Sequence, residues 1–375
     1  MSQPSPQRTD STTSTANATT TGETPNLNVL ILGEGTIAQE LANSYRHLGL
    51  NPVVGSVQDA VTVRPAAVIK TDRPVAVEDL KAVEGETGAV VVPSISACEM
   101  TANRAATRTM ATNELGLPTL EHEFVRTPAE LEAAIERIGY PCVFKPWHSS
   151  DGVGQTVIRS AQDLAEAWGA ARAAEDTDGG VVERFIAADQ EITIITARSI
   201  DPATGKMATW FCEPIGTRHE KGRLVEAWQP AVVSEAAMDN ARSIAARITG
   251  ALDCCGVFAI ELFVDGEEVY FSQVIPRPSR LGMVTRATQR LNQFDLHARA
   301  TIHLPIDVTL VTPGAAVFVP LAGSVVARDR LAAAMSVEET GLQVLGDGAV
   351  VMSTGDTVEE ARERAARAAA CLVGE

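Results

Sequence analysis

The chain of 375 residues lacks the sequence features of membrane proteins and of exported proteins. No apolar run reaches the length that a membrane span requires. Residues 1–26 are rich in Ser, Thr, Pro and Gln, but they lack the apolar stretch of a secretory signal and hold too little arginine for a transit peptide. The sequence therefore predicts a cytoplasmic protein with a disordered tail over residues 1–26.

Positive charge is scarce. Lys and Arg number 31 against 48 Asp and Glu, which gives a formal net charge of −17. Nucleic acids and anionic membranes both require a positively charged surface, so neither is an expected partner. An anion-binding site in this chain has to be local.

Metal-binding and redox patterns are also missing. The six cysteines contain no C-x-x-C pair, and no two histidines have the spacing of a zinc site. Several cysteines lie inside apolar, strand-like runs, which predicts reduced thiols in the core.

The first regular pattern begins at Asn28, where "NVLILGEGTIAQELANSYRHLGL" predicts a buried strand, a glycine turn and an amphipathic helix. Apolar strands are expected near residues 53, 66–70 and 89–92, with a helix near 75–83. This order predicts a small doubly wound α/β domain over residues 27–103. Gly33, Gly35 and Ala38 satisfy a dinucleotide fingerprint, but Ser56 stands where the acid is expected. A nicotinamide-dependent oxidoreductase is therefore a weak alternative.

A lysine near the end of a short apolar run is the strongest candidate for a binding site. In "GYPCVFKPWHSSDGVGQT", residues 141–146 predict a strand that carries Lys145, and a loop of serines and glycines follows. Such a loop is typical of phosphate cradles, although a solvated corner explains the same pattern. It is not a Walker A motif, because the lysine precedes the glycines.

The remaining chain divides at about residue 300. Residues 104–300 mix helices and strands, and "VFAIELFVDGEEVYFSQVIPRP" predicts a hairpin that carries Glu261 and Gln273. A two-residue turn places these two side chains on opposite faces, whereas a three-residue loop or a bulge places them on one face. Residues 301–375 are β-rich and close with a helix that starts at a Thr357/Glu360 capping box.

Together these stretches resemble the ATP-grasp superfamily, and within it the formate-dependent phosphoribosylglycinamide formyltransferases. The resemblance is carried by "NRAATRTMATNELGLPT", "IGYPCVFKP", "GQTVIRSAQDLAEAW", "EITIIT", "EAWQP", "FAIELFV" and "PRP" followed by "GMVT". It implies a pre-ATP-grasp domain, a central ATP-grasp domain over 104–300 and a C-terminal β-rich domain over 301–375. The implied reaction is ATP-dependent formation of an acyl phosphate from a small carboxylate, then attack by an amine. Family members are dimers, so a homodimer is implied.

The resemblance also implies roles for individual residues. Arg104 and Lys145 face the phosphates of ATP, under a loop that contains Ser150, Gly152 and Gln155. The adenine and hinge positions fall at Glu183 and Ile186, and Glu191 meets the ribose hydroxyls. Glu261 and Gln273 occupy the Mg²⁺ positions, and Arg277 is the implied catalytic residue. Without the resemblance, Glu183 and Glu191 are equally well explained as solvated acids at strand ends.

This chain departs from the family at several of its substrate positions. Gln273 replaces a glutamate that bridges metal ions, and Arg280 replaces an aspartate that contacts the substrate. Gly346 and Asp347 stand where paired arginines hold the phosphate of the ribonucleotide. The acidic contacts of the first domain become Ser94, Ser96 and Thr36. These changes leave the amine substrate open, and Gln273 supports a second hypothesis, an ATP-binding protein with weakened catalysis.

Overall fold

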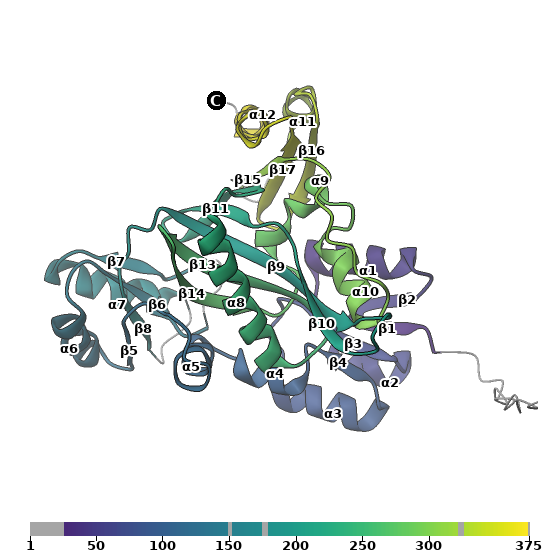
Figure 1. Cartoon of the computed structure of the whole chain (residues 1–375), viewed down its shortest axis with the longest axis horizontal. Helices are drawn as coiled ribbons and strands as arrows, with labels where there is room; N and C mark the ends of the chain where they lie inside the picture. The colour runs from purple at the N-terminus through teal and green to yellow at the C-terminus, as the bar shows by residue number, and fades with distance from the viewer. Residues whose placement is uncertain (1–25, 149–151, 175–178, 322–325, 374–375) are drawn as a thin grey trace, which may run out of the picture.

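The computed structural model describes residues 26–148, 152–174, 179–321 and 326–373 (Figure 1). The predicted disordered tail lies outside these ranges except for its last residue, and the predicted loop residue Ser150 also lies outside them. None of the helices within them is long and apolar enough to cross a membrane. The described residues form three sheets, which confirms the predicted α/β and α+β fold class.

The first sheet is parallel, with the strand order β2-β1-β3-β4. Val29 and Ile31 of β1 pack with α1 on one face, whereas Leu30 and Leu32 pack with α3 on the other. Since apolar side chains of β1 are buried on both faces, this part of the chain is doubly wound, as predicted. Its elements are β1 (Asn28–Leu32), α1 (Gly35–His47), β2 (Asn51–Gly55), α2 (Ala60–Val63), β3 (Ala67–Lys70), α3 (Val77–Thr87), β4 (Val90–Val92) and α4 (Ile95–Met100).

The second sheet is antiparallel, with the order β5-β8-β6-β7, and lies at one end of the molecule (Figure 1). Two helices, α6 and α7, bury one face of it around Phe144 and Val182. The strand predicted from the lysine motif is β6, which is buried throughout. The elements of this region are α5 (Arg104–Thr109), β5 (His122–Val125), α6 (Pro128–Ile138), β6 (Cys142–Pro146), β7 (Thr156–Ile158), α7 (Leu164–Ala173) and β8 (Gly180–Arg184).

The third sheet is the largest and runs through the centre of the molecule. Its order is β14-β13-β9-β11-β12-β15-β17-β16, and β10 pairs with β9. Strand β12 pairs with β15, so the sheet is continuous across the predicted domain boundary near residue 300. Its elements are β9 (Gln190–Ile200), β10 (Met207–Phe211), β11 (Ile215–Glu220), β12 (Arg223–Gln229), β13 (Gly256–Asp265), β14 (Glu268–Ile275), β15 (Gly314–Pro320), β16 (Thr340–Leu345) and β17 (Gly348–Thr354).

Helices on both sides hold this sheet in place. Helix α8 crosses one face of it (Figure 1) and packs on Phe258 and Ile260. On the opposite face, α10 lies between the sheet and α1 of the first domain, where Ser44 Oγ donates to Asp295 Oδ1 over 2.7 Å. The first sheet is thereby fixed against the third. The helices are α8 (Glu235–Leu252), α9 (Thr285–Thr288), α10 (Gln293–Thr301), α11 (Arg328–Met335) and α12 (Val358–Val373), with short 3₁₀ and π turns at Val57–Asp59, Met110–Glu114, Ala161–Asp163 and Arg280–Gly282.

The β13–β14 hairpin combines the two geometries that the sequence left open. Its turn has two residues, Gly266 and Glu267, because Asp265 pairs with Glu268. The register then shifts, so that Leu262 pairs with Phe271 but Glu261 pairs with Gln273. Ser272 is the extra residue of this bulge. The bulge brings Glu261 and Gln273 directly opposite each other.

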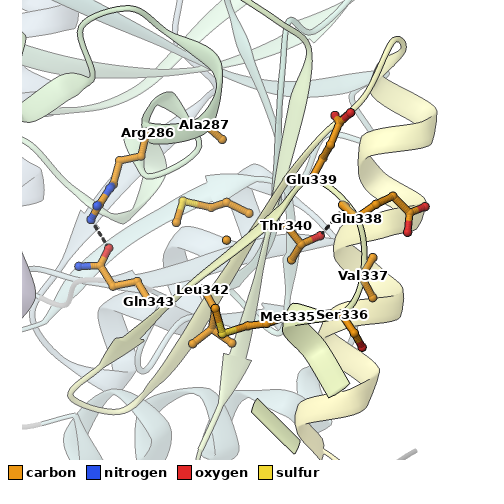
Figure 2. A pocket seen from close by; sticks show the side chains of 12 residues that line it. Arg286, Ala287, Met335, Ser336, Val337, Glu338, Glu339, Thr340, Leu342 and Gln343 are labelled. Atoms are coloured by element: carbon orange, nitrogen blue, oxygen red, sulfur yellow. Dashed lines mark hydrogen bonds between the residues drawn. The ribbon is translucent and has the colours of Figure 1, made fainter. Parts of the chain in front are cut away.

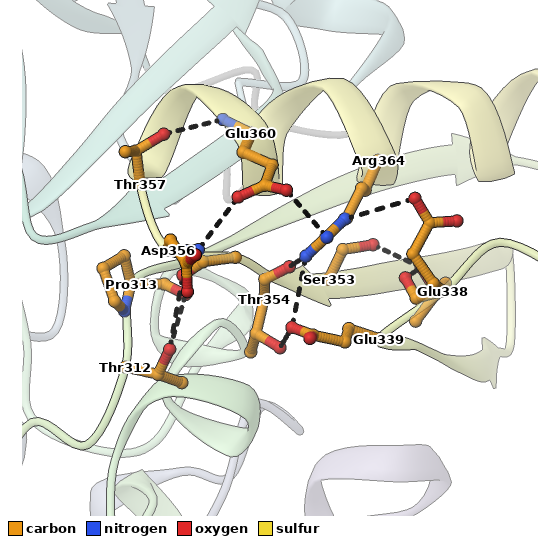
Figure 3. A network of polar contacts seen from close by, with 12 residues as sticks. Thr312, Pro313, Glu338, Glu339, Ser353, Thr354, Asp356, Thr357, Glu360 and Arg364 are labelled. Atoms are coloured by element: carbon orange, nitrogen blue, oxygen red, sulfur yellow. Dashed lines mark hydrogen bonds and ion pairs between the residues drawn. The ribbon is translucent and has the colours of Figure 1, made fainter.

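The C-terminal helix is tied to the β16–β17 hairpin by one arginine. Arg364 contacts the carboxylates of Glu338, Glu339 and Glu360, and its Nη1 donates to the Thr354 carbonyl over 2.7 Å (Figure 3). The predicted capping box at the start of α12 is half right. Thr357 Oγ1 accepts from the Glu360 amide over 3.2 Å, but Glu360 accepts from the amide of residue 356, one position earlier.

Candidate active site

A cleft of about 1340 Å³ opens between the three sheets. It is bounded by the carboxyl end of β3, by β6 and β8 of the second sheet, and by the β13–β14 hairpin. Every predicted site residue that the structure describes lines this cleft: Arg104, Lys145, Gly152, Gln155, Glu183, Ile186, Glu191, Glu261, Gln273 and Arg277. Ser150 lies outside the described residues. Residues from distant parts of the chain thus converge on one site.

Lys145 is held by a buried carboxylate. Its Nζ lies 2.6 Å from Glu183 Oε2, and the second oxygen of Glu183 accepts from Arg108. The Glu183 side chain is 2% exposed, so it is not a solvated acid at a strand end. Burial alone would raise the pKa of Glu183, but the charges of Arg108, Lys145 and Arg104 outweigh burial and lower it to about 2. Glu183 is therefore ionised at neutral pH and fixes the lysine.

Arg108 is a residue of this site that the sequence did not indicate. Its side chain is buried, and its Nη1 also donates to the carbonyl of Phe271 on β14 over 2.8 Å. The signal that could have found it is its position on α5, four residues after Arg104, because residues at that spacing share a helix face. Arg108 links the second sheet to the β13–β14 hairpin on either side of the cleft.

We expect Arg108→Met to destabilise the fold strongly. The change leaves Glu183 buried with one cationic partner fewer, and breaking a buried ion pair costs about 3 kcal/mol. Urea unfolding measures the loss. Arg137→Met is the matched control, because Arg137 pairs with Glu123 on the surface and its loss should leave the free energy of unfolding near that of the unmodified protein. Equal stability of the two variants would contradict this role for Arg108.

Gln273 bridges a cation and an anion across the hairpin. Its Oε1 accepts from Arg104 Nη1 over 2.6 Å, and its Nε2 donates to Glu261 Oε1. Arg104 is itself oriented by a hydrogen bond from Nε to the Pro146 carbonyl over 3.1 Å. Burial is the main cause that raises the pKa of Glu261. The predicted metal pair is thus brought together, with the amide oxygen turned toward Arg104.

The donor set fits one magnesium ion better than two. The described residues contain no group of three His, Cys, Asp or Glu side chains placed to hold a metal. Mg²⁺ is commonly held by one or two carboxylates together with the phosphates of a bound nucleotide. Glu261 can supply the carboxylate, whereas Gln273 presents its amide N–H toward the same place.

Glu191 has a partner that the sequence did not indicate. Nδ1 of His219 on β11 lies 2.7 Å from Oε2 of Glu191 on β9, and both residues line the cleft. Pairing of these two strands brings Thr217 opposite Glu191, which places His219 nearby. Burial lowers the pKa of His219, but the hydrogen bond to Glu191 and the charges of Glu191 and Glu261 outweigh it, so the net shift is upward.

This pair predicts a pH-dependent contribution to stability. A raised folded pKa means that the stabilisation is fully present below the unfolded value of about 6.5 and is lost as the pH rises through the folded value. The stability difference between the unmodified protein and His219→Gln should therefore be largest near pH 6, at less than about 1 kcal/mol, and should shrink toward pH 9. Unfolding curves at both pH values measure it. A difference that grows with pH would contradict the assignment.

The loop after β6 rests against the turn between β11 and β12. Gly152 has a φ of +72°, and a Cβ there would lie 1.8 Å from the carbonyl oxygen of Gly222. The Gln155 amide donates to the Gly152 carbonyl over 3.1 Å. Glycine is therefore required at position 152 for two reasons, its backbone angle and the close approach of the neighbouring turn.

A smaller hollow of about 760 Å³ lies beside β16 and is lined mainly by residues 335–343 (Figure 2). Arg286 reaches it, but this guanidinium is engaged by Glu40 at 2.8 Å and by Gln343. None of the predicted site residues lies there. The hollow therefore does not compete with the cleft as the candidate active site.

Comparison with known proteins agrees with this geometry. Residues 110–294 match the ATP-grasp domain. A formate-dependent phosphoribosylglycinamide formyltransferase of Corynebacterium glutamicum (strain R) is 43% identical over 387 aligned positions, covering 93% of this chain and 95% of that protein. The chain belongs to this enzyme family. It is accordingly an ATP-dependent enzyme of the ATP-grasp type.

Other relatives extend the comparison. A formate-dependent phosphoribosylglycinamide formyltransferase of Paraburkholderia xenovorans is 37% identical, over 92% of this chain and 94% of that protein. The structure of glycinamide-RNase-transformylase T from Mycobacterium tuberculosis matches with a TM-score of 0.77 at 31% identity, covering 92% and 99% of the two chains. A carboxyaminoimidazole ribonucleotide synthase of Aspergillus clavatus, complexed with ATP, reaches a TM-score of 0.81 at 21% identity over 93% and 99%, which supports the fold alone.

The glycine turn of the first domain does not support the oxidoreductase alternative. Thr71 fills the space beside Gly33, where an added Cβ would lie 2.0 Å from Thr71 Oγ1. At the start of α1, Thr36 Oγ1 donates to the Val344 carbonyl of β16 over 3.4 Å. The turn is packed against its own chain, and the family to which the chain belongs is one of formate-dependent formyltransferases and not of oxidoreductases.

Proposed function

We propose that the protein joins a small carboxylate to an amine, using ATP and passing through an acyl phosphate. The observation that carries the proposal is the convergence of the predicted residues on one cleft. There, Glu183 fixes Lys145 on β6, and Gln273 and the Pro146 carbonyl fix Arg104 at the start of α5. Such fixed cations suit a polyphosphate, because they need no rearrangement when the ligand binds.

The nucleotide is assigned to the side of the cleft formed by β6, β8 and β9. Lys145 and Arg104 neutralise its phosphates, and the loop with Gly152 and Gln155 lies over them. Ile186, just after β8, and the Glu191/His219 pair accept the base and the ribose. A neutralised triphosphate is a better leaving group, which is what transfer of its γ-phosphoryl group requires.

Magnesium is assigned to Glu261 together with the nucleotide phosphates. When bound, the ion supplies charge neutralisation at the phosphoryl group that is transferred. Gln273 contributes differently from a carboxylate, since its amide orients Arg104 and Glu261 at the same time. We propose that Arg104 supplies part of the positive charge that a second metal ion would otherwise bring.

The proposed chemistry has two steps. A carboxylate oxygen attacks the γ-phosphorus of ATP, the bond to the β-phosphate oxygen breaks, and ADP leaves. The amine then attacks the carbonyl carbon of the acyl phosphate, inorganic phosphate leaves with the former carboxylate oxygen, and the amine loses a proton to water. Arg277 and Lys70 line the same cleft and are assigned to the incoming carboxylate.

A second candidate function is nucleotide binding with greatly reduced turnover. Gln273 favours it, because one carboxylate offers a weaker site for a metal ion than two. The small-molecule substrates and the homodimer implied by the resemblance, and the cytoplasmic location predicted from the sequence, remain predictions.

A screen of ADP release separates the two functions. The full chain is mixed with ATP and Mg²⁺, and small carboxylates and amines are added singly and in pairs. The proposal expects ADP release that requires one carboxylate and rises when the matching amine is added, with an equal amount of amide formed. ATP binding without ADP release from any pair would favour the second candidate.

A further inference from the structure

One end of the cleft is cationic and lies apart from the strands assigned to the nucleotide. Lys70 at the end of β3 and Arg277 and Arg280 after β14 line this end, with Asp72 as the nearby acid. Burial, and then the neighbouring charge of Arg277, lower the pKa of Lys70. Two cations so close that one lowers the pKa of the other favour an anionic ligand. Such a ligand would lie between β3 and the β13–β14 hairpin.

Arg280 reaches from this end of the cleft to the β16–β17 turn. Its Nη2 pairs with Asp347 in that turn, and the two side chains are 32% and 53% exposed. No second partner of this guanidinium lies among the described residues. Since a guanidinium carries five N–H donors in a planar fork, most of its capacity is left for a ligand.

The residue before Arg280 has a buried hydroxyl without a partner. Ser279 lines the cleft and is 5% exposed, and its Oγ has no hydrogen-bond partner among the described residues. The side-chain amide of Gln293 fixes its backbone, because Oε1 accepts from the Ser279 amide over 3.0 Å and Nε2 donates to the Ser279 carbonyl over 2.7 Å. A buried, unpaired hydroxyl is unfavourable, so this rigid position is suited to a polar group of a bound substrate.

We infer that the amine substrate carries a carboxylate, which Arg280 and the Ser279 hydroxyl hold together. This inference rests on the proposed ligase function and names the class of its second substrate as amino acids. One guanidinium and one hydroxyl match a single negative charge. A phosphate monoester carries about −1.5 to −2 at neutral pH, so Asp347 repels it more strongly than it repels a singly charged carboxylate.

The Arg280–Asp347 pair then has a measurable consequence. Asp347 competes with the substrate carboxylate for the same guanidinium, so removing it should strengthen substrate binding. A purely structural ion pair predicts the opposite, because its loss would weaken the site or leave it unchanged. Substitution of Arg280 should therefore raise the KM of the amine, and substitution of Asp347 should lower it.

The probes are amino acids and their own amides, which differ only in the charge of one group. ADP release is measured for the full chain with ATP, Mg²⁺ and formate, adding glycine, L-alanine or L-glutamate and, separately, the α-amide of each. We expect ADP release to be faster with each amino acid than with its α-amide, and we expect the N-formyl amino acid as the product. Glycinamide ribonucleotide serves as the phosphate-bearing comparison.

Three variants connect the preference to named groups. Arg280→Met should raise the KM of the amino acid by about 10- to 100-fold, the effect of losing a hydrogen bond between charged groups, with the KM of ATP unchanged. Asp347→Asn should lower that KM, and Ser279→Ala should raise it less than Arg280→Met. Arg290→Met is the matched control, because Arg290 also pairs with an aspartate, at 3.5 Å, but does not line the cleft.

The outcomes separate this inference from the proposed function. Equal rates with amino acids and amides, a preference that Arg280→Met leaves intact, or robust turnover of glycinamide ribonucleotide would overturn the inference while leaving the ligase proposal standing. ATP binding with no ADP release from any amine would overturn both.

Discussion

Lys145→Met is expected to weaken ATP binding by about 10- to 100-fold, because a hydrogen bond between charged groups contributes about 1.5–3 kcal/mol. The lysine ends a rigid, buried strand and faces the cleft, so its ammonium acts on the phosphates with little loss of side-chain freedom. The change also removes one of the two ion-paired cations of the buried Glu183, as Arg108→Met does, so it should lower the stability as well, while the remaining pair with Arg108 keeps the protein folded under the conditions of the titration. Isothermal titration with ATP measures the affinity, and urea unfolding measures the stability.

Lys81→Met is the control for this prediction. Lys81 also pairs with a glutamate, at 2.7 Å, but its side chain is 53% exposed and does not line the cleft. Its replacement should leave the ATP affinity unchanged. An unchanged affinity in Lys145→Met as well would contradict the assignment of the phosphate site.

Gln273→Glu is expected to raise ADP release by about 10- to 100-fold and to lower the Mg²⁺ concentration needed for half-maximal rate. The change places a second carboxylate directly opposite Glu261, which supplies a ligand for a further ion at the transferred phosphoryl group. Loss of one oxyanion-stabilising interaction typically costs about 10²–10³ in rate, and the gain expected here is smaller because Arg104 already supplies part of the positive charge. Steady-state ADP release over a series of Mg²⁺ concentrations is the measurement.

The same variant should become more dependent on metal for its stability. Without an ion, Glu261 would face a carboxylate in place of the donating amide of Gln273, and like charges in a buried place repel each other. Its melting temperature should therefore rise with Mg²⁺ more steeply than that of the unmodified protein. Gln190→Glu, at the start of β9, is the isosteric control. Identical responses of all three proteins to Mg²⁺ would contradict the magnesium assignment.

Restoring this carboxylate should not by itself create activity on glycinamide ribonucleotide. Arg280 and Asp347 still occupy the positions where the resemblance implies contacts to that substrate, and they remain paired with each other. Product analysis of the Gln273→Glu variant tests this. Formylation of glycinamide ribonucleotide at a high rate would show that the metal position alone limits the reaction.

The residues of the cleft were predictable because their local patterns are strong. A short apolar run that carries a lysine predicts a buried strand, and β6 confirms it. Glu261 stands between apolar neighbours on a predicted hairpin strand, where a surface role is hard to accommodate. The order of the motifs along the chain resembles that of the ATP-grasp superfamily, and this resemblance implied that these distant residues meet in one site.

Long-range pairing explains what the sequence did not reveal. His219 meets Glu191 because β11 pairs with β9, and nothing near either residue specifies that pairing. The bulge at Ser272 sets the register of Glu261 and Gln273, yet it has no glycine to mark it. Continuity of the third sheet past residue 300 likewise depends on β12 pairing with β15, two strands that are far apart in the sequence.

Oxygen transfer from the carboxylate to phosphate tests the central claim most directly. The unmodified protein is incubated with ATP, Mg²⁺, the matching amine and a carboxylate labelled with ¹⁸O in both oxygens, and the inorganic phosphate is examined by mass spectrometry. An acyl phosphate predicts one labelled oxygen in each phosphate for each amide formed. Amide formation with unlabelled phosphate, or labelled carboxylate recovered unchanged while ATP is hydrolysed, would contradict it.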